Sequence, residues 1–260
     1  MTGSGPIVSI IIPCYLQAQY LPDALDSILA QTYPHWEAIV VNDASPDNTK
    51  EIAGTYASRD ARITLLNLEQ NAGLPNARNS GIKATKGVFI LPLDADDKIA
   101  PTYLEKSLQV FNESPSVKVV YTDVQCFGIR QDKVQRHDPD LKALCRQNLF
   151  QPTAMYRRSD FEKTKGYRVK IGYEDWDLWL QLIDRNEDAF RIPEPLFFFH
   201  CKEKSMIKDL QAERDKALAV RKQVLINNLP KIRKYAPDLV PAEYRSLAKK
   251  IRTALKRPFG

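Results

Sequence analysis

The sequence predicts an α/β protein with a mostly parallel central sheet covered by helices on both faces. Two observations lead to this fold class. Through the first 125 residues, short apolar runs alternate regularly with amphipathic stretches of helical spacing. The apolar runs are continuous, as in "IVSIII" at 7–12, which is typical of strands buried on both faces of a parallel sheet.

The first half repeats one strand–helix unit. The run at 7–12 is stopped by Pro13, and the next stretch starts with Pro22, which suits a first helical turn, and carries Leu25 and Ile28 on one face. Capping residues precede the second helical stretch. Strands are expected at 7–12, 37–41, 62–68, 87–93 and 117–124. Helices are expected at 22–31, 45–57, 76–85 and 102–111.

The second half carries fewer local signals. Residues 126–172 read as irregular, with one or two strands, and 174–185 forms a helix with Trp176 and Trp179 on one face. A strand is expected at 189–199. From about residue 209 the chain is expected to be helical, with breaks near Pro230, Pro237 and Pro241.

Composition predicts a globular protein of one ordinary to large domain with a terminal extension. Of its 260 residues, 43% are hydrophobic and 27% are charged, which provides ample material for a core. No apolar run is long enough to span a bilayer, and the first residues lack the pattern of a signal peptide. The four scattered cysteines are expected to be reduced, mostly buried thiols of a cytoplasmic protein.

Charge is distributed unevenly along the chain. Residues 204–260 contain 15 Lys and Arg against five Asp and Glu, a local charge of +10, so the remainder carries −4. Such a basic segment is compatible with nucleic acid, an acidic partner or an anionic membrane face. We expect no nucleic acid, because the segment lacks aromatic or recognition patterning.

The tetrad "DADD" at 94–97 is the densest polar signal in the sequence. Asp94, Asp96 and Asp97 follow an apolar strand, and ligands of parallel sheets bind beyond the carboxyl ends of the strands. Clustered carboxylates there favour a divalent cation, Mn²⁺ or Mg²⁺, that completes its coordination shell with the phosphates of a substrate. The alternative is that they cap the helix entered at Pro101, although one Asp suffices for a cap.

A second acidic pair, Glu174 and Asp175, opens the predicted helix at 174–185. Acidic residues in a first turn favour the helix dipole, which is one explanation for the pair. The other is that one carboxylate is a general base in a cleft. The sequence contains neither a GxGxxG fingerprint after the first strand nor a P-loop.

Five segments together resemble the family 2 inverting glycosyltransferases of the GT-A fold, in the order and spacing of that family across about 7–206. They are "VSIIIPCYLQAQYLPDALDSILAQTY" at 8–33, "VVNDASPDNT" at 40–49, "NAGLPNARNSGIKATKG" at 71–87, "LDADD" at 93–97 and "GYEDWDLWLQL" at 172–182. The resemblance implies a Rossmann-like nucleotide-sugar half at about 1–125, an acceptor half at about 126–206, and a helical basic extension at 207–260.

The resemblance also implies roles for individual residues. Asp43 contacts the nucleotide base, Asp94 to Asp96 engage ribose and the metal that holds the diphosphate, and Asp175 is the base that activates an acceptor hydroxyl. The donor is a nucleotide sugar, with UDP the commonest carrier, and the acceptor is a saccharide or lipid-linked hydroxyl. The expected donor-binding residues are Pro13, Tyr15, Asp43, Arg78, Asp94, Ala95 and Asp96, with Asp94 and Asp96 at the metal.

Several of these residues have a second interpretation. Arg78 suits a diphosphate clamp but is also compatible with a helix surface, and Tyr15 either packs beside the base or belongs to the core. Glu174, Asp97, His200 and Trp176 are secondary candidates. His200 is either a phosphate or metal ligand or a packed side chain, and Trp176 is core or a wall of the acceptor site.

The chain departs from the family at two places. Many relatives carry "DDGS" where this chain has "NDAS", so Asn42 and Ala44 replace Asp and Gly. Near residue 200 the family often has a basic "YRxHxxS" segment, and here "FFFHCKEKSM" offers His200 and Lys202.

Two rival functions lack support in the sequence. A nucleotidyltransferase needs a Gly-rich phosphate loop that "PCYLQAQYL" lacks, and a non-catalytic binding module would not need Asp94, Asp96 and Asp175 together.

The extension has an apolar stripe that either packs on the protein's own body or lies at the inner face of a membrane as a peripheral anchor. The stripe consists of Val240, Tyr244, Leu247, Ile251 and Ala254.

Overall fold

The computed structural model describes residues 8–169, 172–203 and 206–245. The strands are β1 Val8–Cys14, β2 Trp36–Asn42, β3 Ile63–Asn67, β4 Phe89–Pro92, β5 Lys98–Ile99, β6 Val119–Gly128, β7 Lys133–Val134, β8 Met155–Arg157 and β9 Ala189–Cys201. The α-helices are α1 Leu21–Leu29, α2 Thr49–Arg59, α3 Leu74–Ala84, α4 Tyr103–Glu113, α5 Leu141–Leu144, α6 Arg158–Phe161, α7 Glu174–Leu182, α8 Met206–Ala212, α9 Arg214–Asn227 and α10 Leu229–Tyr235. Two 3₁₀ turns are Asn186–Asp188 and Pro237–Leu239.

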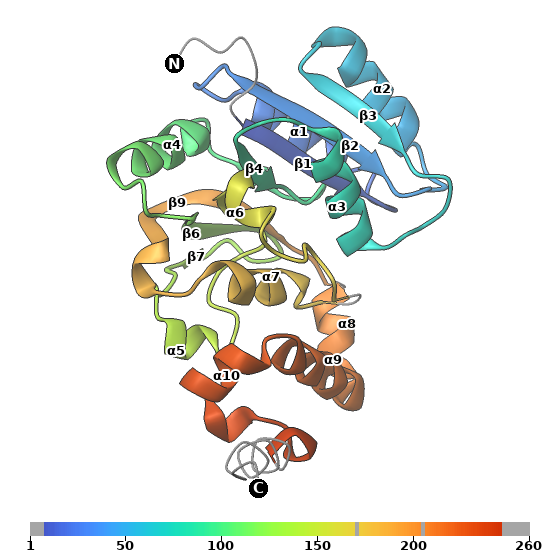
Figure 1. The fold of residues 1–260 in the computed structure, drawn as a ribbon. Helices are drawn as coiled ribbons and strands as arrows, with labels where there is room; N and C mark the ends of the chain where they lie inside the picture. Colours follow the sequence, from blue (N-terminus) through green and yellow to red (C-terminus); the bar gives the residue numbers. More distant parts are fainter. Residues whose placement is uncertain (1–7, 170–171, 204–205, 246–260) are drawn as a thin grey trace, which may run out of the picture.

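The strands form one mixed sheet in the order β3-β2-β1-β4-β8-β6-β9-β5, with β7 paired to β6 (Figure 1). The first four strands of this order are parallel, as predicted. Beyond β4 the sheet changes direction, because β8 runs antiparallel to both β4 and β6, while β6 and β9 are again parallel. The α/β prediction is therefore confirmed, with the parallel part concentrated in the first half.

Two hydrophobic layers cover the sheet, one on each face. Strand β1 is buried along its whole length and contributes Ile10 and Ile12 to one layer and Ile11 to the other, the period of two expected of a strand. The first layer includes residues of α1, α2 and α4. The second includes residues of α3, α7, α9 and α10. The continuous apolar runs of the sequence follow from this burial on both faces.

Helix α3 lies very close to the parallel strands. A Cβ atom on Gly81 would stand 2.6 Å from the Cγ2 atom of Ile11, so only glycine permits this packing. Close packing here aligns the start of α3 with the carboxyl ends of β1 and β2, where the site residues are expected.

The described part of the extension packs on the second layer. Val224, Ile232 and Val240 are buried in the same cluster as Trp176 and Trp179, and Tyr244 packs against it. Helices α9 and α10 lie at the opposite end of the molecule from α2 and β3 (Figure 1). For the first part of the apolar stripe, packing on the protein's own body is therefore confirmed. Leu247, Ile251 and Ala254 lie outside the described residues.

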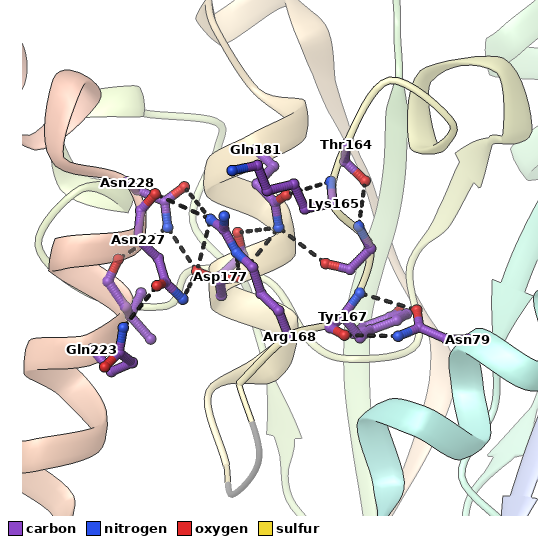
Figure 2. A network of polar contacts seen from close by, with 12 residues as sticks. Asn79, Thr164, Lys165, Tyr167, Arg168, Asp177, Gln181, Gln223, Asn227 and Asn228 are labelled. Atoms are coloured by element: carbon purple, nitrogen blue, oxygen red, sulfur yellow. Dashed lines mark hydrogen bonds and ion pairs between the residues drawn. The ribbon is translucent and has the colours of Figure 1, made fainter.

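A buried polar network joins the extension to α7 (Figure 2). Asp177 is fully buried and accepts hydrogen bonds from Arg168 Nε at 2.7 Å and from Asn228 Nδ2 at 2.8 Å. Asn227 and Gln181 also donate to this carboxylate. Since Asp177 is two residues from Asp175, the network fixes the first turn of α7 from the side of the extension.

Several boundaries differ from the sequence prediction. Helix α7 ends at Leu182 because Ile183 is already extended, and helix α8 begins at Met206, before the expected residue 209. Pro230 is the second residue of α10, where proline is well tolerated, so the break falls before it, at Asn228. All four cysteines are free and buried, as predicted. None of the described helices is long and apolar enough to cross a membrane.

Candidate active site

A cavity of about 940 Å³ opens where the sequence places its polar motifs. It lies beyond the carboxyl ends of β1, β2 and β4, as expected for parallel strands, and is lined by residues of both halves of the chain. Pro13, Tyr15, Asp43, Ala95 and Asp175 line it. Asp94, Asp96, Asp97, Glu174 and His200 line it as well. All the predicted site residues except Arg78 and Trp176 therefore line this cavity.

Each carboxylate of the "DADD" turn has a different partner. Asp94 Oδ1 accepts a hydrogen bond from Arg78 Nη2 at 2.6 Å, and Asp96 forms an ion pair with Lys202. Asp97 is buried and accepts the backbone N–H of His200 at 2.8 Å. Burial, together with the charges of Asp96 and Asp94, raises the pKa of Asp97 well above its usual range. We therefore interpret Asp97 as the residue that attaches this turn to β9.

Arg78 is completely buried and links the two acidic motifs. Its Nη2 atom donates to Asp94 and its Nη1 atom donates to Glu174 Oε1, each at 2.6 Å. Burial alone would lower the pKa of Arg78, but the charges of Asp94 and Glu174 raise it well above its usual value. The helix-surface interpretation is wrong. In place of the diphosphate clamp expected from the sequence, we interpret Arg78 as a residue that positions both carboxylates.

Glu174 and Asp175 begin α7 and have different environments. Tyr173 precedes them in a left-handed conformation with φ of 59°, which turns the chain sharply into the helix. The charge of Glu174 is paired with Arg78. Asp175 has no cation within ion-pair distance among the described residues. Its Oδ2 atom accepts from Asn148 Nδ2 at 2.8 Å, and its Oδ1 atom accepts the backbone N–H of Trp176 at 2.8 Å.

The environment of Asp175 makes its carboxylate basic. Burial, and next the charge of Glu174, raise the pKa of Asp175 to about 7, against the hydrogen bond from Asn148 and the charge of Arg78. A carboxylate with this pKa is matched to proton transfer near neutral pH. Of the two acidic residues, Asp175 is therefore the one whose carboxylate is suited to accept a proton.

At the ends of β1 and β2, Asp43 holds a loop beside the cavity. Its two carboxylate oxygens accept the backbone N–H groups of Ala72 at 2.7 Å and Gly73 at 2.9 Å. Each carboxylate oxygen has a second lone pair, so these bonds leave room for a contact to a nucleotide base. Ala44, which replaces the family's Gly, has φ of 53° and keeps the left-handed backbone that Gly would adopt easily. Tyr15 is exposed at the cavity and not part of the core.

The two remaining secondary candidates are packed side chains. The His200 ring stacks on Phe127 and meets the edge of Tyr20, and burial lowers its pKa. Its Nδ1 atom is buried without a partner among the described residues. Trp176 belongs to the core, where its Nε1 atom donates to the carbonyl of Leu144 at 2.7 Å, so it is not a wall of the cavity.

Sequence reasoning missed several cavity residues. Arg136, Asn148 and Gln151 come from the stretch 126–172, in which no periodicity marks them. Asp209 and Gln211 of α8 also line the cavity, although the predicted extension was not assigned to the site. The sequence places Lys202 near His200 but does not indicate that Lys202 pairs with Asp96. Their common position at one cavity depends on tertiary packing, which local sequence patterns do not reveal.

This fold and this site define a glycosyltransferase of the GT-A fold. The chain belongs to glycosyl transferase family 2, whose family model matches residues 9–174. EpsE of Bacillus subtilis (strain 168), which is named as a glycosyltransferase, is 32% identical over 203 residues, which cover 75% of this chain and 73% of EpsE. TuaG of the same organism, whose name refers to a glycosyltransferase of teichuronic acid biosynthesis, is 41% identical over 113 residues. That match covers 44% of this chain and 45% of TuaG, less than half of either.

Solved structures share the fold at low sequence identity. S. aureus TarS residues 1–349 in complex with UDP-GlcNAc superposes with a TM-score of 0.67 at 20% identity and covers 92% of this chain and 77% of that one. The mannosyltransferase PcManGT from Pyrobaculum calidifontis in complex with GDP-Man and Mn²⁺ gives 0.62 at 19% identity, with 98% and 82% covered. The resemblance found in the sequence motifs is confirmed at the level of family and fold.

The buried position of Arg78 predicts a large stability effect. Arg78→Met should lower the free energy of unfolding by about 3–5 kcal/mol, because it leaves two carboxylates without their cation. Urea unfolding at neutral pH measures this loss. Adding Glu174→Gln should recover part of it, since the buried unpaired charge is then removed.

Arg130→Met is the matched control, because Arg130 forms an exposed ion pair with Asp132. This variant should change stability by no more than about 1 kcal/mol. If Arg78→Met is as stable as this control, the buried ion pairs do not hold the site together.

Proposed function

We propose that this protein is an inverting glycosyltransferase that moves a sugar from a nucleotide-diphosphate donor to a hydroxyl of a saccharide or lipid-linked acceptor in cell-surface polysaccharide synthesis. One observation carries the proposal. Asp175 is a buried carboxylate with a pKa raised to about 7, and it lines the same cavity as the acidic turn. The UDP-GlcNAc and UDP complexes of TarS and the name of TuaG favour a UDP-sugar and an envelope polymer.

Asp175 performs the proton transfer in this proposal. Its carboxylate accepts the proton of the acceptor hydroxyl, whose oxygen attacks the anomeric carbon from the face opposite the nucleotide, so the configuration inverts. The single displacement needs no covalent intermediate, and the protein contributes mainly orientation and electrostatics. Asn148 holds Asp175 Oδ2, and the Trp176 backbone holds Oδ1, so the base is oriented before the substrate arrives.

The acidic turn suits a divalent cation only in combination with a substrate. Among the described residues, no three His, Cys, Asp or Glu side chains are grouped to bind a metal alone. Mg²⁺ typically uses one or two carboxylates and completes its shell with phosphates, and Asp96, with Asp94 nearby, fits this donor set. A bound Mn²⁺ or Mg²⁺ would neutralise the charge that develops on the departing diphosphate. Lys202, which is paired with Asp96, would then be available to contact the phosphates.

The basic extension supports a peripheral position at the inner face of a membrane. Lys249, Lys250, Arg252, Lys256 and Arg257 give residues 246–260 five positive charges and no acidic residue. Each such charge near an anionic leaflet contributes about 1 kcal/mol. The buried Ile232 and Val240 exclude a role of their side chains in membrane contact, so the charges carry this part of the proposal.

Nucleotide binding tests the proposed function directly. UDP should bind in the presence of Mn²⁺ and lose at least about tenfold in affinity in excess EDTA, because a cation–phosphate contact contributes several kcal/mol. Asp96→Ala should have nearly the same effect in isothermal titration calorimetry. Asp138→Ala is the control, since Asp138 is an exposed carboxylate outside the cavity. Full UDP affinity in EDTA would reject the metal, and a panel of UDP-, GDP- and dTDP-sugars identifies the donor.

The pKa of Asp175 predicts an acidic limb in the pH profile. A base must be deprotonated, so kcat/KM should rise with pH and reach half of its plateau near pH 7, measured as nucleoside diphosphate release. Asp175→Asn should lower turnover by about 10²-fold or more and remove this limb, with donor affinity almost unchanged. An Asn variant with wild-type turnover would make Asp175 structural and Glu174 the next candidate.

Membrane binding is tested on the intact chain. Substituting the five basic residues of 246–260 by Gln should abolish salt-sensitive binding to vesicles that contain phosphatidylserine, and neutral phosphatidylcholine vesicles should bind neither protein. Sedimentation with vesicles at low salt measures both. Substitution is preferable to truncation at residue 231, because truncation would delete the buried Ile232 and Val240. Equal binding of both proteins to anionic vesicles would contradict the proposed membrane contact.

A further inference from the structure

The cavity has a second polar side, which belongs to the stretch 126–172. Arg136 follows β7, and Asn148 and Gln151 precede β8. All three side chains line the cavity that Asp175 lines. None of them is used by the proposed donor contacts, which lie at the acidic turn and at the ends of β1 and β2.

Arg136 contributes a positive charge that the protein does not pair. Among the described residues, no carboxylate lies within ion-pair distance of its guanidinium, and its Nε atom is buried without a hydrogen-bond partner. The carboxylate of Asp123 accepts the backbone N–H of Arg136, but it forms its ion pair with Arg191, at 2.9 Å. Lys202, which also lines the cavity, is paired with Asp96. A largely desolvated cation without a counter-ion is costly, so an anion in the cavity would be strongly favoured.

Arg136 lies on the side of the base. Burial lowers the pKa of Arg136. The negative charge of Asp175 opposes this effect more strongly than that of Asp123 does. An anion on Arg136 would therefore belong to the molecule that Asp175 deprotonates.

The position of Arg136 is built into the fold. Its backbone N–H donates to Asp123 Oδ1 at 2.8 Å, and the next residue, His137, accepts a hydrogen bond from Tyr121 Oη at its carbonyl at 2.5 Å. Strand β6, which carries both partners, lies inside the sheet. The backbone that presents the guanidinium is thus fixed, so little ordering is required on binding.

Two buried oxygens near the base also have no partner. Asn148 Oδ1 and Gln151 Oε1 accept no hydrogen bond among the described residues. The amide groups cannot be reversed, because Asn148 Nδ2 donates to Asp175 and Gln151 Nε2 donates to the carbonyl of Thr122 at 3.0 Å. Buried acceptors without donors are costly, and the hydroxyl groups of a sugar are suitable donors.

We propose that the acceptor is a saccharide that carries an anionic group, a carboxylate or a phosphate, bound by the guanidinium of Arg136. Hydroxyl groups of the same saccharide donate to Asn148 Oδ1 and Gln151 Oε1, while the reacting hydroxyl donates to Asp175. The inference rests on the proposed transferase function and specifies its acceptor. Bidentate contact to a planar guanidinium suits both kinds of oxyanion.

Three glycosides with one sugar ring test this inference on the full-length protein. They are methyl β-D-glucoside as the neutral probe, methyl β-D-glucuronide as the carboxylate and methyl β-D-glucoside 6-phosphate as the phosphate. Their dissociation constants are measured by NMR titration, with and without UDP and Mn²⁺. At least one charged glycoside should bind about tenfold or more tightly than the neutral one, the range of a hydrogen bond to a charged group. The preferred anion distinguishes a uronate from a phosphate acceptor.

Variants assign the preference to Arg136. Arg136→Met should remove the preference for charged glycosides and leave the UDP dissociation constant unchanged. Arg136→Lys should retain part of the preference. Arg130→Met, at an exposed arginine outside the cavity, should retain all of it. Binding without preference for charge, or a preference that survives Arg136→Met, overturns the inference, as does weakened UDP binding in Arg136→Met. Absence of UDP binding together with an intact preference would reject the donor assignment alone.

Discussion

The geometry of the candidate site depends on one buried cation, the guanidinium of Arg78. It joins Asp94, 16 residues away in the chain, to Glu174, 96 residues away, and so connects the strand end of the first half with the helix start of the second. A guanidinium offers its donors in a rigid plane, so two carboxylates bonded to it have a defined separation. Arg78 and Glu174 are buried and Asp94 is partly exposed in the cavity, so loss of the guanidinium would leave a buried carboxylate without its cation.

This ion triad also separates the roles of adjacent acidic residues. Glu174 and Asp175 are neighbours in sequence, yet Glu174 shares a cation and Asp175 does not. The unshared carboxylate is buried beside a charged one, and its pKa rises to about 7. The acidic turn divides its residues in the same manner, since Asp94 is held by Arg78, Asp96 by Lys202, and Asp97 by a backbone N–H of β9. Differences in partner, more than differences in residue type, produce the chemistry of this cavity.

How much the sequence predicts depends on the range of the interactions involved. Strands β1 to β4 and helices α1 to α4 follow from local periodicity and from proline or capping residues, so they were predicted within a few residues. The two-residue strands β5 and β7 have no such signal, because they exist only through pairing with β9 and β6. Likewise, helical spacing predicts that Arg78 lies on a helix but not that it is buried. The apolar stripe of the extension has the same sequence pattern whether it covers a core or lies on a membrane. Val240 shows that part of it covers a core.

Among the described residues, Lys202 and Arg136 are the cations that line the cavity, and they imply different costs for the two proposed substrates. Lys202 already has a partner in Asp96, so a metal-bound diphosphate at the proposed donor site would have to rearrange an existing ion pair before its own contacts form. Arg136 has no such partner among the described residues, so an anionic acceptor would add a contact without breaking one. Binding of the proposed donor would therefore replace an existing ion pair, whereas binding of the proposed acceptor would add a new one. For this reason, selectivity for charge should be sharper for the acceptor than for the donor. At the donor site, the contacts of the bound metal ion and phosphates would largely offset the loss of the ion pair between Lys202 and Asp96.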